Sequence, residues 1–365
     1  MAELVRFINL SVDDAERREY LKVIDQVLAS GQFLNSSECE RFETGVAKYC
    51  DAAYAVGVAS GTAALYLALK CLRIGPGDEV IMPALSFVGT ANAVAAVGAT
   101  PVFVDIRNDL LIDPSAIESA ITKNTKAIMP VQFTGNIGDM DAIGSIARRH
   151  SIPIVEDAAP AFGATYRGKK AGTFGILGCF SMNPMKVLGA VGEAGAILTQ
   201  SEQMREKLME LRYHGIKGKE ICLDVSTNGR LDAIQSAVLS IRLRSHEERL
   251  ERRRHIAERY ASRLSNIVEL PKVNAEVRPA WYHYTILCDC RDDLMKALEN
   301  DKIESRIYHS RLMPAHPPFA SDLDRFKIGR AIVDRILCLP MHEKLRDDEV
   351  DRVADSISRF YGRPS

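Results

Sequence analysis

Short runs of apolar residues alternate along the chain with segments whose apolar positions recur every three or four residues. The short runs predict buried strands, and the wider spacing predicts amphipathic helices. Up to residue 214 the pattern predicts strands at 54–58, 79–82, 101–105, 126–131, 152–155, 176–180 and 194–199. It predicts helices at 15–29, 38–50, 139–150 and 202–214, and helix starts near Ser60, Ser86 and Asp113. This regular alternation favours an α/β fold, with a mostly parallel sheet covered by helices on both faces.

The pattern changes after about residue 250, where a long helix predicted at 231–264 is under way. The segments that follow predict strands at 281–290 and 303–308 and helices at 292–299, 328–337 and 347–361. This mixture favours a smaller α+β domain that the long helix packs onto the first. We therefore expect a large α/β domain at residues 1–250 and a small C-terminal α+β domain at 251–365, as the chain length of 365 residues also suggests.

Composition adds limits on the class of protein. Hydrophobic residues make up 47% and charged residues 26% of the chain, which is typical of a soluble globular protein. The formal net charge of −1 gives no reason to expect a nucleic-acid partner. The apolar run 91–99 is too short to span a membrane and no signal peptide is evident, so we expect no membrane partner. The eight cysteines form no C-x-x-C pair, which favours reduced thiols in a cytoplasmic protein, and we predict no metal site.

One segment, residues 242–255, is rich in arginine. Glutamates at positions 247, 248 and 251 interrupt this run, so the opposite charges can pair with one another along a helix. The pattern favours a solvated face with salt bridges, and a binding site for an anionic partner is the alternative.

A single lysine, Lys186, lies in a glycine-containing loop between the predicted strands 176–180 and 194–199. A lysine held between two buried strands is partly withdrawn from water, which disfavours its charge and lowers its pKa. Such an amine is suited to attack a carbonyl group. A solvated loop lysine without a chemical role fits the loop pattern as well.

Two carboxylates, Glu156 and Asp157, follow the strand 152–155 at its carboxyl end. Ligands of open α/β sheets bind at that end of the strands. In pyridoxal-phosphate enzymes a lysine forms a Schiff base with the cofactor and a carboxylate pairs with its pyridinium nitrogen. Lys186 and Asp157 are candidates for these two roles, although Asp157 is also a suitable strand-end cap.

Three segments then carry a family resemblance: EDAAPAFGA at 156–164, GTFGILGCFSMNPMK at 172–186 and GEAGAILT at 192–199. They resemble the pyridoxal-phosphate aminotransferases of the DegT/DnrJ/EryC1/StrS group, which mostly aminate nucleotide-linked keto-sugars or cyclitols. The resemblance extends from about residue 31 to the C-terminus. It implies a fold-type-I pyridoxal-phosphate-dependent transferase, similar to aspartate aminotransferase, in which Lys186 holds the cofactor and Asp157 keeps the ring nitrogen protonated. The cofactor would be pyridoxal 5′-phosphate, with pyridoxamine 5′-phosphate as the intermediate form.

The same resemblance assigns the remaining cofactor contacts. Ser60, Gly61 and Thr62 open a predicted helix, and a helix start is a ready phosphate site, although a simple Ser/Thr cap has the same pattern. In the resembled enzymes this segment and the residue matching Ser181 cradle the phosphate. An aromatic at the position of Phe87 stacks on the ring. The remaining contact is Asn228, which matches an asparagine that reaches the phosphate of the neighbouring subunit, so a homodimer is expected.

Three residues are weaker candidates for contact with the sugar substrate: Arg230, beside Asn228, and the two histidines His309 and His316. Lone histidines are more often structural. The chain also departs from the family at Pro160, where the resembled enzymes commonly have a glutamine near the ring hydroxyl. Proline has no donor to offer at that place.

The function implied by this resemblance is transfer of an amino group from an amino acid, glutamate or glutamine, to a keto-sugar, most often a nucleotide-linked one. One alternative is an aminotransferase for cyclitols or free keto-sugars. Another is a non-catalytic regulatory member of the family, against which the intact Lys186, Asp157 and Ser60–Thr62 segment argue. The sequence identifies neither the sugar nor the nucleotide, nor the carbon that is aminated.

Overall fold

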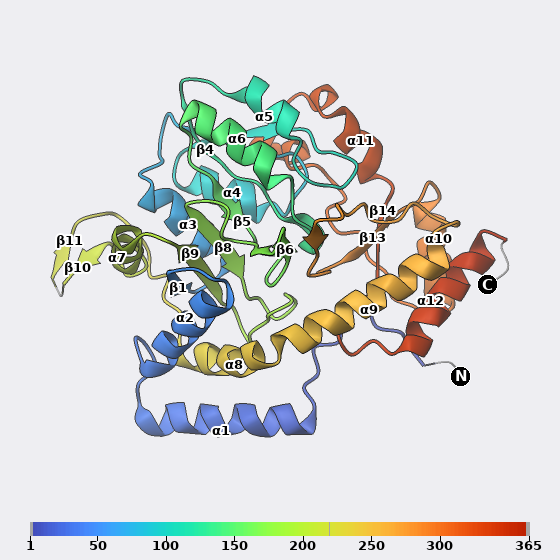
Figure 1. The fold of residues 1–365 in the computed structure, drawn as a ribbon, viewed down its shortest axis with the longest axis horizontal. Coiled ribbons are helices and arrows are strands. Elements are labelled where there is room, and N and C mark those ends of the chain that lie inside the picture. Colours follow the sequence, from blue (N-terminus) through green and yellow to red (C-terminus); the bar gives the residue numbers. More distant parts are fainter. Residues whose placement is uncertain (1–2, 219, 363–365) are drawn as a thin grey trace.

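A sheet of seven described strands forms the centre of the computed structural model, which describes residues 3–218 and 220–362 (Figure 1). Across the sheet the strands are β1 (Tyr54–Val58), β9 (Gly195–Thr199), β8 (Leu177–Ser181), β5 (Val155–Asp157), β4 (Thr125–Ile128), β2 (Glu79–Pro83) and β3 (Thr100–Val104). The isolated parallel bridges Ile128–Ile154 and Val131–Asp157 join β4 to β5. Among these strands β9 alone runs antiparallel to its neighbours, so the predicted mostly parallel sheet is confirmed.

Helices from both sides bury this sheet. They are α2 (Ser37–Tyr49), α3 (Gly61–Cys71), α4 (Gly89–Ala96), α5 (Pro114–Ala120), α6 (Met140–His150), α7 (Glu202–Leu211) and α8 (Ala233–Arg244). Along β2, Val80 and Met82 belong to one apolar cluster and Ile81 to another, because successive side chains of a strand point to opposite faces. A further helix, α1 (Asp14–Ser30), packs along α8 at the outside of the molecule (Figure 1).

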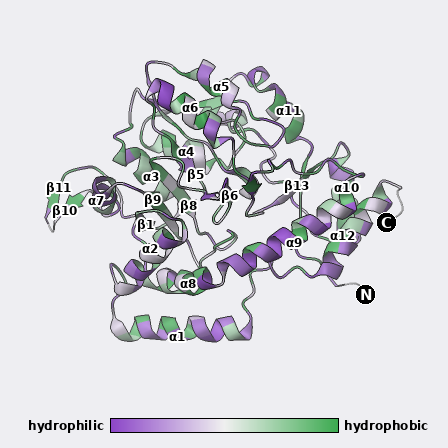
Figure 2. Ribbon diagram, viewed as in Figure 1, coloured by the Kyte–Doolittle hydropathy of each residue, from purple (hydrophilic) through white to green (hydrophobic). Residues whose placement is uncertain are grey.

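The last third of the chain forms a third apolar cluster. It is built from α9 (His246–Leu264), β13 (Tyr284–Leu287), α10 (Arg291–Asn300), β14 (Ile336–Leu339) and α12 (Asp347–Phe360). Val5 joins this cluster through a parallel bridge to Ile303, so a segment from the opposite end of the sequence packs with it. Figure 2 shows hydrophilic residues along most of α9, whose apolar residues Ile256 and Tyr260 are buried in the cluster.

The remaining elements are short. They are β6 (Thr165–Tyr166), β7 (Lys169–Lys170), β10 (Ile216–Lys217), β11 (Ile221–Cys222), β12 (Val277–Arg278) and α11 (Lys327–Val333), with 3₁₀ turns at Phe133–Gly135, Met313–Ala315, Pro317–Phe319 and Leu323–Arg325. β10 and β11 form a hairpin that extends from the body of the molecule (Figure 1). Its strand β11 carries Ile221, which is 63% exposed.

The long helix predicted at 231–264 is wrong in one respect, because it is divided at Ser245 into α8 and α9. Ser245 has φ −102° and ψ 15°, outside the α-helical region. The residues that follow it turn toward an apolar cluster on one face of the sheet, where His246 Nε2 lies 3.3 Å from the carbonyl oxygen of Phe162 and Leu250 is buried. Tertiary packing therefore breaks a helix that local propensity would continue.

Three predictions near the C-terminus are also corrected. The strand predicted at 281–290 shortens to β13, and residues 303–308 form isolated bridges, Val5–Ile303 and Arg306–Cys338, in place of a strand. The helix predicted at 328–337 ends at Val333, and its last residues enter β14, which pairs with β13. A short apolar run such as ILCL at 336–339 fits a helix or a strand equally well, and here the pairing partner decides.

Candidate active site

A cavity of about 490 Å³ lies where several strands of the sheet end. Its lining comes from segments after β1, β2, β5 and β8, together with residues just before β13 and around position 308. Eight of the eleven residues predicted from the sequence line it: Ser60, Gly61, Thr62, Phe87, Asp157, Ser181, Lys186 and His309. The fold thus brings together residues that are up to 249 positions apart (309 minus 60).

Lys186 lies in the loop between β8 and β9. Lys186 is half-buried and lines the cavity, and its amine lies 4.2 Å from the centroid of the Tyr282 ring. Burial lowers the pKa of Lys186 from 10.5 to about 8, and the negative charges of Asp157 and Glu193 oppose this shift. The loop therefore has the effect on the lysine pKa that the sequence predicts.

Asp157, the last residue of β5, is buried at the cavity wall. Its Oδ2 accepts a 2.7 Å hydrogen bond from the hydroxyl of Thr90, and its Oδ1 accepts one of 3.2 Å from the backbone N–H of Ala159. Burial raises the pKa of Asp157, whereas these two bonds and the charge of Lys186 act in the opposite direction. A buried carboxylate of this kind favours a cationic group placed beside it.

The start of α3 forms the second end of the cavity. Ser60 caps this helix, its hydroxyl accepting a hydrogen bond of 3.1 Å from the N–H of Ala63. A Cβ at Gly61 would lie 2.5 Å from the Cβ of Ser181, so glycine allows the end of β8 to contact the helix start. Free N–H groups and the helix dipole make this an anion site, with the hydroxyls of Thr62 and Ser181 beside it.

Phe87 presents an aromatic face to the cavity. Its side chain is 59% exposed, although Ser86 before it is buried. A Cβ at Gly89 would lie 2.8 Å from the Phe87 ring, so glycine permits this ring position. His309 lies nearby, with 6.0 Å between the two ring centroids, and burial lowers its pKa to about 4. An exposed aromatic ring of this kind offers a stacking surface to a flat ligand.

These features fit the chemical groups of pyridoxal phosphate. An amine of lowered pKa suits its aldehyde, a buried carboxylate suits its ring nitrogen, a helix start suits its phosphate, and an exposed aromatic face suits its flat ring. Two of the close approaches, at Gly61 and Gly89, would be lost with any larger side chain.

Several cavity residues were not singled out in the sequence. Thr90 is the most direct, since it binds Asp157 and also lies 3.2 Å from the hydroxyl of Ser86. The spacing of Ser86 and Thr90, four residues apart at a predicted helix start, was the available signal. His283 is buried against the cavity, and its Nε2 has no hydrogen-bond partner among the described residues. Thr134, Tyr282 and Tyr308 also line the cavity.

Three predicted residues lie outside the cavity lining. Asn228 is exposed and forms an antiparallel bridge with Tyr213. Its Oδ1 accepts a 3.1 Å hydrogen bond from Arg230 Nε, and the guanidinium of Arg230 lies 3.9 Å from the Tyr213 ring centroid. His316 is half-buried beside a 3₁₀ turn. Within one chain the fold therefore leaves the Asn228–Arg230 pair away from the cavity.

No group of three or more histidine, cysteine, aspartate or glutamate side chains among the described residues is arranged to hold a metal ion. None of the helices found between residues 3 and 362, with residue 219 left out, is long and apolar enough to cross a membrane.

Comparison with known proteins identifies the family. Residues 14–358 match the DegT/DnrJ/EryC1/StrS aminotransferase family. The chain is 37% identical to dTDP-3-amino-3,4,6-trideoxy-alpha-D-glucose transaminase of Streptomyces venezuelae, over 98% of this chain and 97% of that protein. The crystal structure of DesV from S. venezuelae superposes with a TM-score of 0.95 at 36% identity and covers both chains completely.

A second solved structure bears on the cofactor. The crystal structure of NtdA from Bacillus subtilis, with the bound cofactor PMP, superposes with a TM-score of 0.91 at 30% identity, over 100% of this chain and 86% of that one. These likenesses confirm the expected fold-type-I transferase fold. The chain therefore belongs to the DegT/DnrJ/EryC1/StrS aminotransferase family and is a pyridoxal-phosphate-dependent aminotransferase.

Proposed function

We propose that this enzyme transfers the amino group of an amino acid, glutamate or glutamine, to a keto-sugar carried on a nucleotide. The main support is that Lys186, Asp157 and the start of α3 line one cavity. The likeness to a transaminase named for a dTDP-linked amino sugar, along nearly the whole of both chains, supports the substrate class.

Lys186 would be the group that moves protons in this reaction. When bound, pyridoxal phosphate supplies an electron-withdrawing ring that stabilises negative charge on the carbon losing a proton. A base works best when its pKa lies near the working pH, and burial brings the pKa of Lys186 to about 8. The Tyr282 ring and the neighbouring Glu193 would keep the amine inside the cavity.

Asp157 would fix the ring nitrogen and keep a proton on it. Its two carboxylate oxygens are held by Thr90 and by the N–H of Ala159, so the group has one orientation. The start of α3, with Thr62 and Ser181, would hold the phosphate at the other end of the cavity. Between them Phe87 would cover one face of the ring.

The exposed Asn228–Arg230 pair supports a homodimer as the active unit. The pair lies away from the cavity of its own chain, and Arg230 is already oriented by the Tyr213 ring. In a two-fold dimer a segment that reaches the partner's cavity does so twice, once for each site. Asn228 would then bind the phosphate held by the partner subunit, and Arg230 would contact the substrate there.

The direct test is an amination screen of the purified enzyme. With L-glutamate or L-glutamine as donor, it would be given dTDP-, UDP- and GDP-linked keto-sugars, free keto-sugars and cyclitol ketones, and products would be detected by mass spectrometry. We expect an amino sugar from at least one nucleotide-linked acceptor, and none from the Lys186→Ala enzyme. Amination of cyclitols or free sugars alone would contradict the proposed substrate class.

A further inference from the structure

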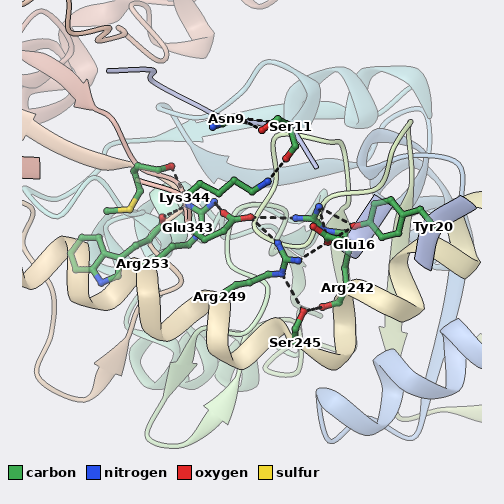
Figure 3. Close-up of polar contacts among 12 residues, drawn as sticks. Asn9, Ser11, Glu16, Tyr20, Arg242, Ser245, Arg249, Arg253, Glu343 and Lys344 are labelled. Atoms are coloured by element: carbon green, nitrogen blue, oxygen red, sulfur yellow. Dashed lines mark hydrogen bonds and ion pairs between the residues drawn. The ribbon is translucent and has the colours of Figure 1, made fainter. Parts of the chain in front are cut away.

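A second cavity, of about 250 Å³, adjoins the lysine loop and shares Met185 and Lys186 with the first. We name it the arginine cavity, after Arg242 of α8 and Arg249 and Arg253 of α9, which line it (Figure 3). Its other walls are residues 8–12 near the start of the chain, the loop 184–191 and residues 342–344 before α12. Four parts of the sequence far from one another thus enclose it, within residues 8–16, 184–191, 242–253 and 342–344.

The charges around this cavity do not balance. Four cationic side chains and two carboxylates line it in addition to Lys186: Arg242, Arg249, Arg253, Lys344, Glu16 and Glu343. Two positive charges are therefore in excess. The arginines are 4–16% exposed, so the prediction of a solvated face along this segment is wrong for them. Burial makes an excess of charge costly unless an anion compensates it.

The two carboxylates are already engaged. Glu343 lies 3.1 Å from Arg249 through Oε1 and 3.0 Å from Arg253 through Oε2. Glu16 lies 2.6 Å from Arg249 and also accepts a hydrogen bond from Tyr20. The pairs form the row of dashed contacts in Figure 3. Neither carboxylate is left over to neutralise the excess charge.

Three buried nitrogen atoms at this cavity have no hydrogen-bond partner among the described residues: Arg242 Nε, Arg253 Nε and His342 Nδ1. Each Nε of an arginine carries one N–H donor. The Nε2 of His342 lies 3.2 Å from the carbonyl oxygen of Arg6, to which it must donate, and burial lowers the pKa of His342 to about 4. The His342 ring is therefore neutral, and its Nδ1 is an acceptor. Beside this cavity two donors and one acceptor therefore have no partner among the described residues.

These requirements describe one kind of ligand. A carboxylate accepts charge-assisted hydrogen bonds from arginine, and bonds of this kind are strong. A hydroxyl or ammonium group on the same molecule would donate to His342 Nδ1, which a halide or a simple carboxylate leaves unpaired. A single water needs only about 10–15 Å³ of such space, so the cavity has room for a small organic molecule.

We propose that the arginine cavity binds a small carboxylic acid that carries a hydrogen-bond donor beside its carboxylate, that is, a hydroxy acid or an amino acid. Arg242 and Arg253 hold its carboxylate, and His342 accepts from its hydroxyl or ammonium. Lys344, whose amine donates to the Ser11 carbonyl oxygen, lies at the same cavity and contributes to the positive field.

The test uses the holoenzyme and ligands that cannot donate an amino group. Isothermal titration calorimetry at constant ionic strength would compare L-lactate, propionate and inorganic phosphate. We expect one lactate per chain, bound about tenfold more tightly than propionate, because the two acids differ by the hydroxyl that pairs with His342. Phosphate should bind more weakly than lactate. Equal affinities for lactate and propionate, or tighter binding of phosphate, would overturn the assignment of the ligand class.

Substitutions locate the bound acid. Arg242→Met should weaken lactate binding by at least about tenfold. The matched control is Arg244→Met on the same helix, because the Arg244 side chain is 70% exposed and does not line the cavity. That variant should bind lactate as the wild type does.

A second variant covers the case in which Arg242→Met fails to fold. Lys344→Met removes one of the two excess charges without touching the arginine–glutamate row and should weaken lactate binding by about threefold to tenfold. Lactate binding that is unchanged in Arg242→Met and in Lys344→Met would show that lactate binds outside the arginine cavity and would reject the site. Loss of lactate binding in Arg230→Met, with binding retained in these two variants, would do the same.

Discussion

The two cavities share Lys186 but are built in different ways. In the first, each oxygen of the buried Asp157 already accepts one hydrogen bond, from Thr90 and from the N–H of Ala159. In the arginine cavity the charged groups are paired only in part, and Nε of Arg242 and Arg253 lacks a partner among the described residues. A carboxylate oriented by hydrogen bonds and arginines that are paired only in part therefore indicate different functions. The first holds a reacting group in place, and the second leaves donors for a ligand.

The largest effect should come from Lys186→Ala, which removes the amine that the two cavities share. Loss of a nucleophile and proton-transfer group of this kind lowers turnover by about a thousandfold or more. The variant should still bind lactate in the arginine cavity within about threefold of the wild type, since both arginines remain. Rate measurements and calorimetry on the same sample would separate the two cavities. Loss of lactate binding together with turnover would show that they act as one site.

Asp157→Asn should be the next most damaging change. An amide keeps the shape and still accepts from Thr90, but it carries no negative charge to hold a proton on the ring nitrogen. We expect turnover to fall by about a hundredfold to a thousandfold while cofactor remains bound, because electrostatic groups at reacting centres have effects of this size. Steady-state kinetics would measure the turnover, and absorbance of the cofactor would measure the amount that remains bound. Near wild-type turnover would reject the role of Asp157.

Removal of the cofactor should make stability depend on Lys186 and pH. In the folded chain burial lowers its pKa to about 8, below the ordinary 10.5 expected on unfolding. Between these values the unfolded state binds more protons, so the free energy of unfolding rises with pH. Below about pH 8 both states are protonated, and the buried charge is costly. Lys186→Met should therefore be more stable than the wild type there by about 1–3 kcal/mol.

The check is urea unfolding of both cofactor-free proteins at several pH values. The stability advantage of Lys186→Met should shrink as pH rises from about 8 and vanish above 10.5. A constant difference across this range would show that the amine is not buried as a charge.

Thr90→Val sharpens the contrast between engaged and unengaged polar groups. The substitution removes the hydroxyl that donates to Asp157 and keeps a similar shape. We expect turnover to fall by about tenfold, with a shift of the acid limb of the pH profile to higher pH, because Asp157 is then harder to ionise. Thr90→Ser should restore the turnover and the pH profile. Ser86→Ala should change them less, because the Ser86 hydroxyl contacts Thr90 and not Asp157. If the pH profile of Thr90→Val equals that of the wild type, Thr90 contributes only to packing.

How far the sequence predicts these sites depends on where their residues lie. Seven of the eight predicted cavity residues come from segments that directly follow strands β1, β2 and β8 or end β5, so strand ends and motifs locate them. Thr90 was missed because its spacing from Ser86 marks a pair of hydroxyls at a helix start but does not indicate a carboxylate 67 positions away. The arginine cavity could not be foreseen, since only the break at Ser245 and the packing of residues 8–12 turn a charged helix inward.

The arginine-rich segment 242–255 shows the same limit of prediction from sequence, here for the choice of salt-bridge partners. Along the sequence, Glu247 and Glu251 are the nearest partners for the arginines of α9. In the fold Arg254 does pair with Glu251 at 2.5 Å, but Arg249 and Arg253 pair with Glu343, about ninety positions away. Spacing along one helix therefore predicts the pair with the exposed Glu251 and misses the pairs with the more buried Glu343, because buried charges take whichever partner the tertiary packing supplies.

The smallest effect is expected from Asn228→Ala, because Asn228 lies outside the cavity of its own chain. If it reaches the phosphate of a partner subunit, the change should weaken cofactor binding by about threefold to tenfold without unfolding the subunit. Dilution of the wild type should release cofactor for the same reason, since association and cofactor binding favour each other. Fluorescence of released cofactor against protein concentration would measure both effects. Cofactor affinity that is independent of concentration would argue for a site complete within one chain.

Mixing two inactive or weakened variants tests the shared site most directly. In a mixed dimer of Lys186→Ala and Asn228→Ala chains, one site carries both defects and the other carries neither. Free exchange makes about half of the dimers mixed, so activity at limiting cofactor should exceed that of either parent, to about a quarter of the wild-type level. Arg244→Met chains in place of Asn228→Ala serve as the control, because Arg244 lies on α8 with an exposed side chain. If exchange is shown by labelled subunits and the mixture gains nothing, Asn228 acts within its own chain.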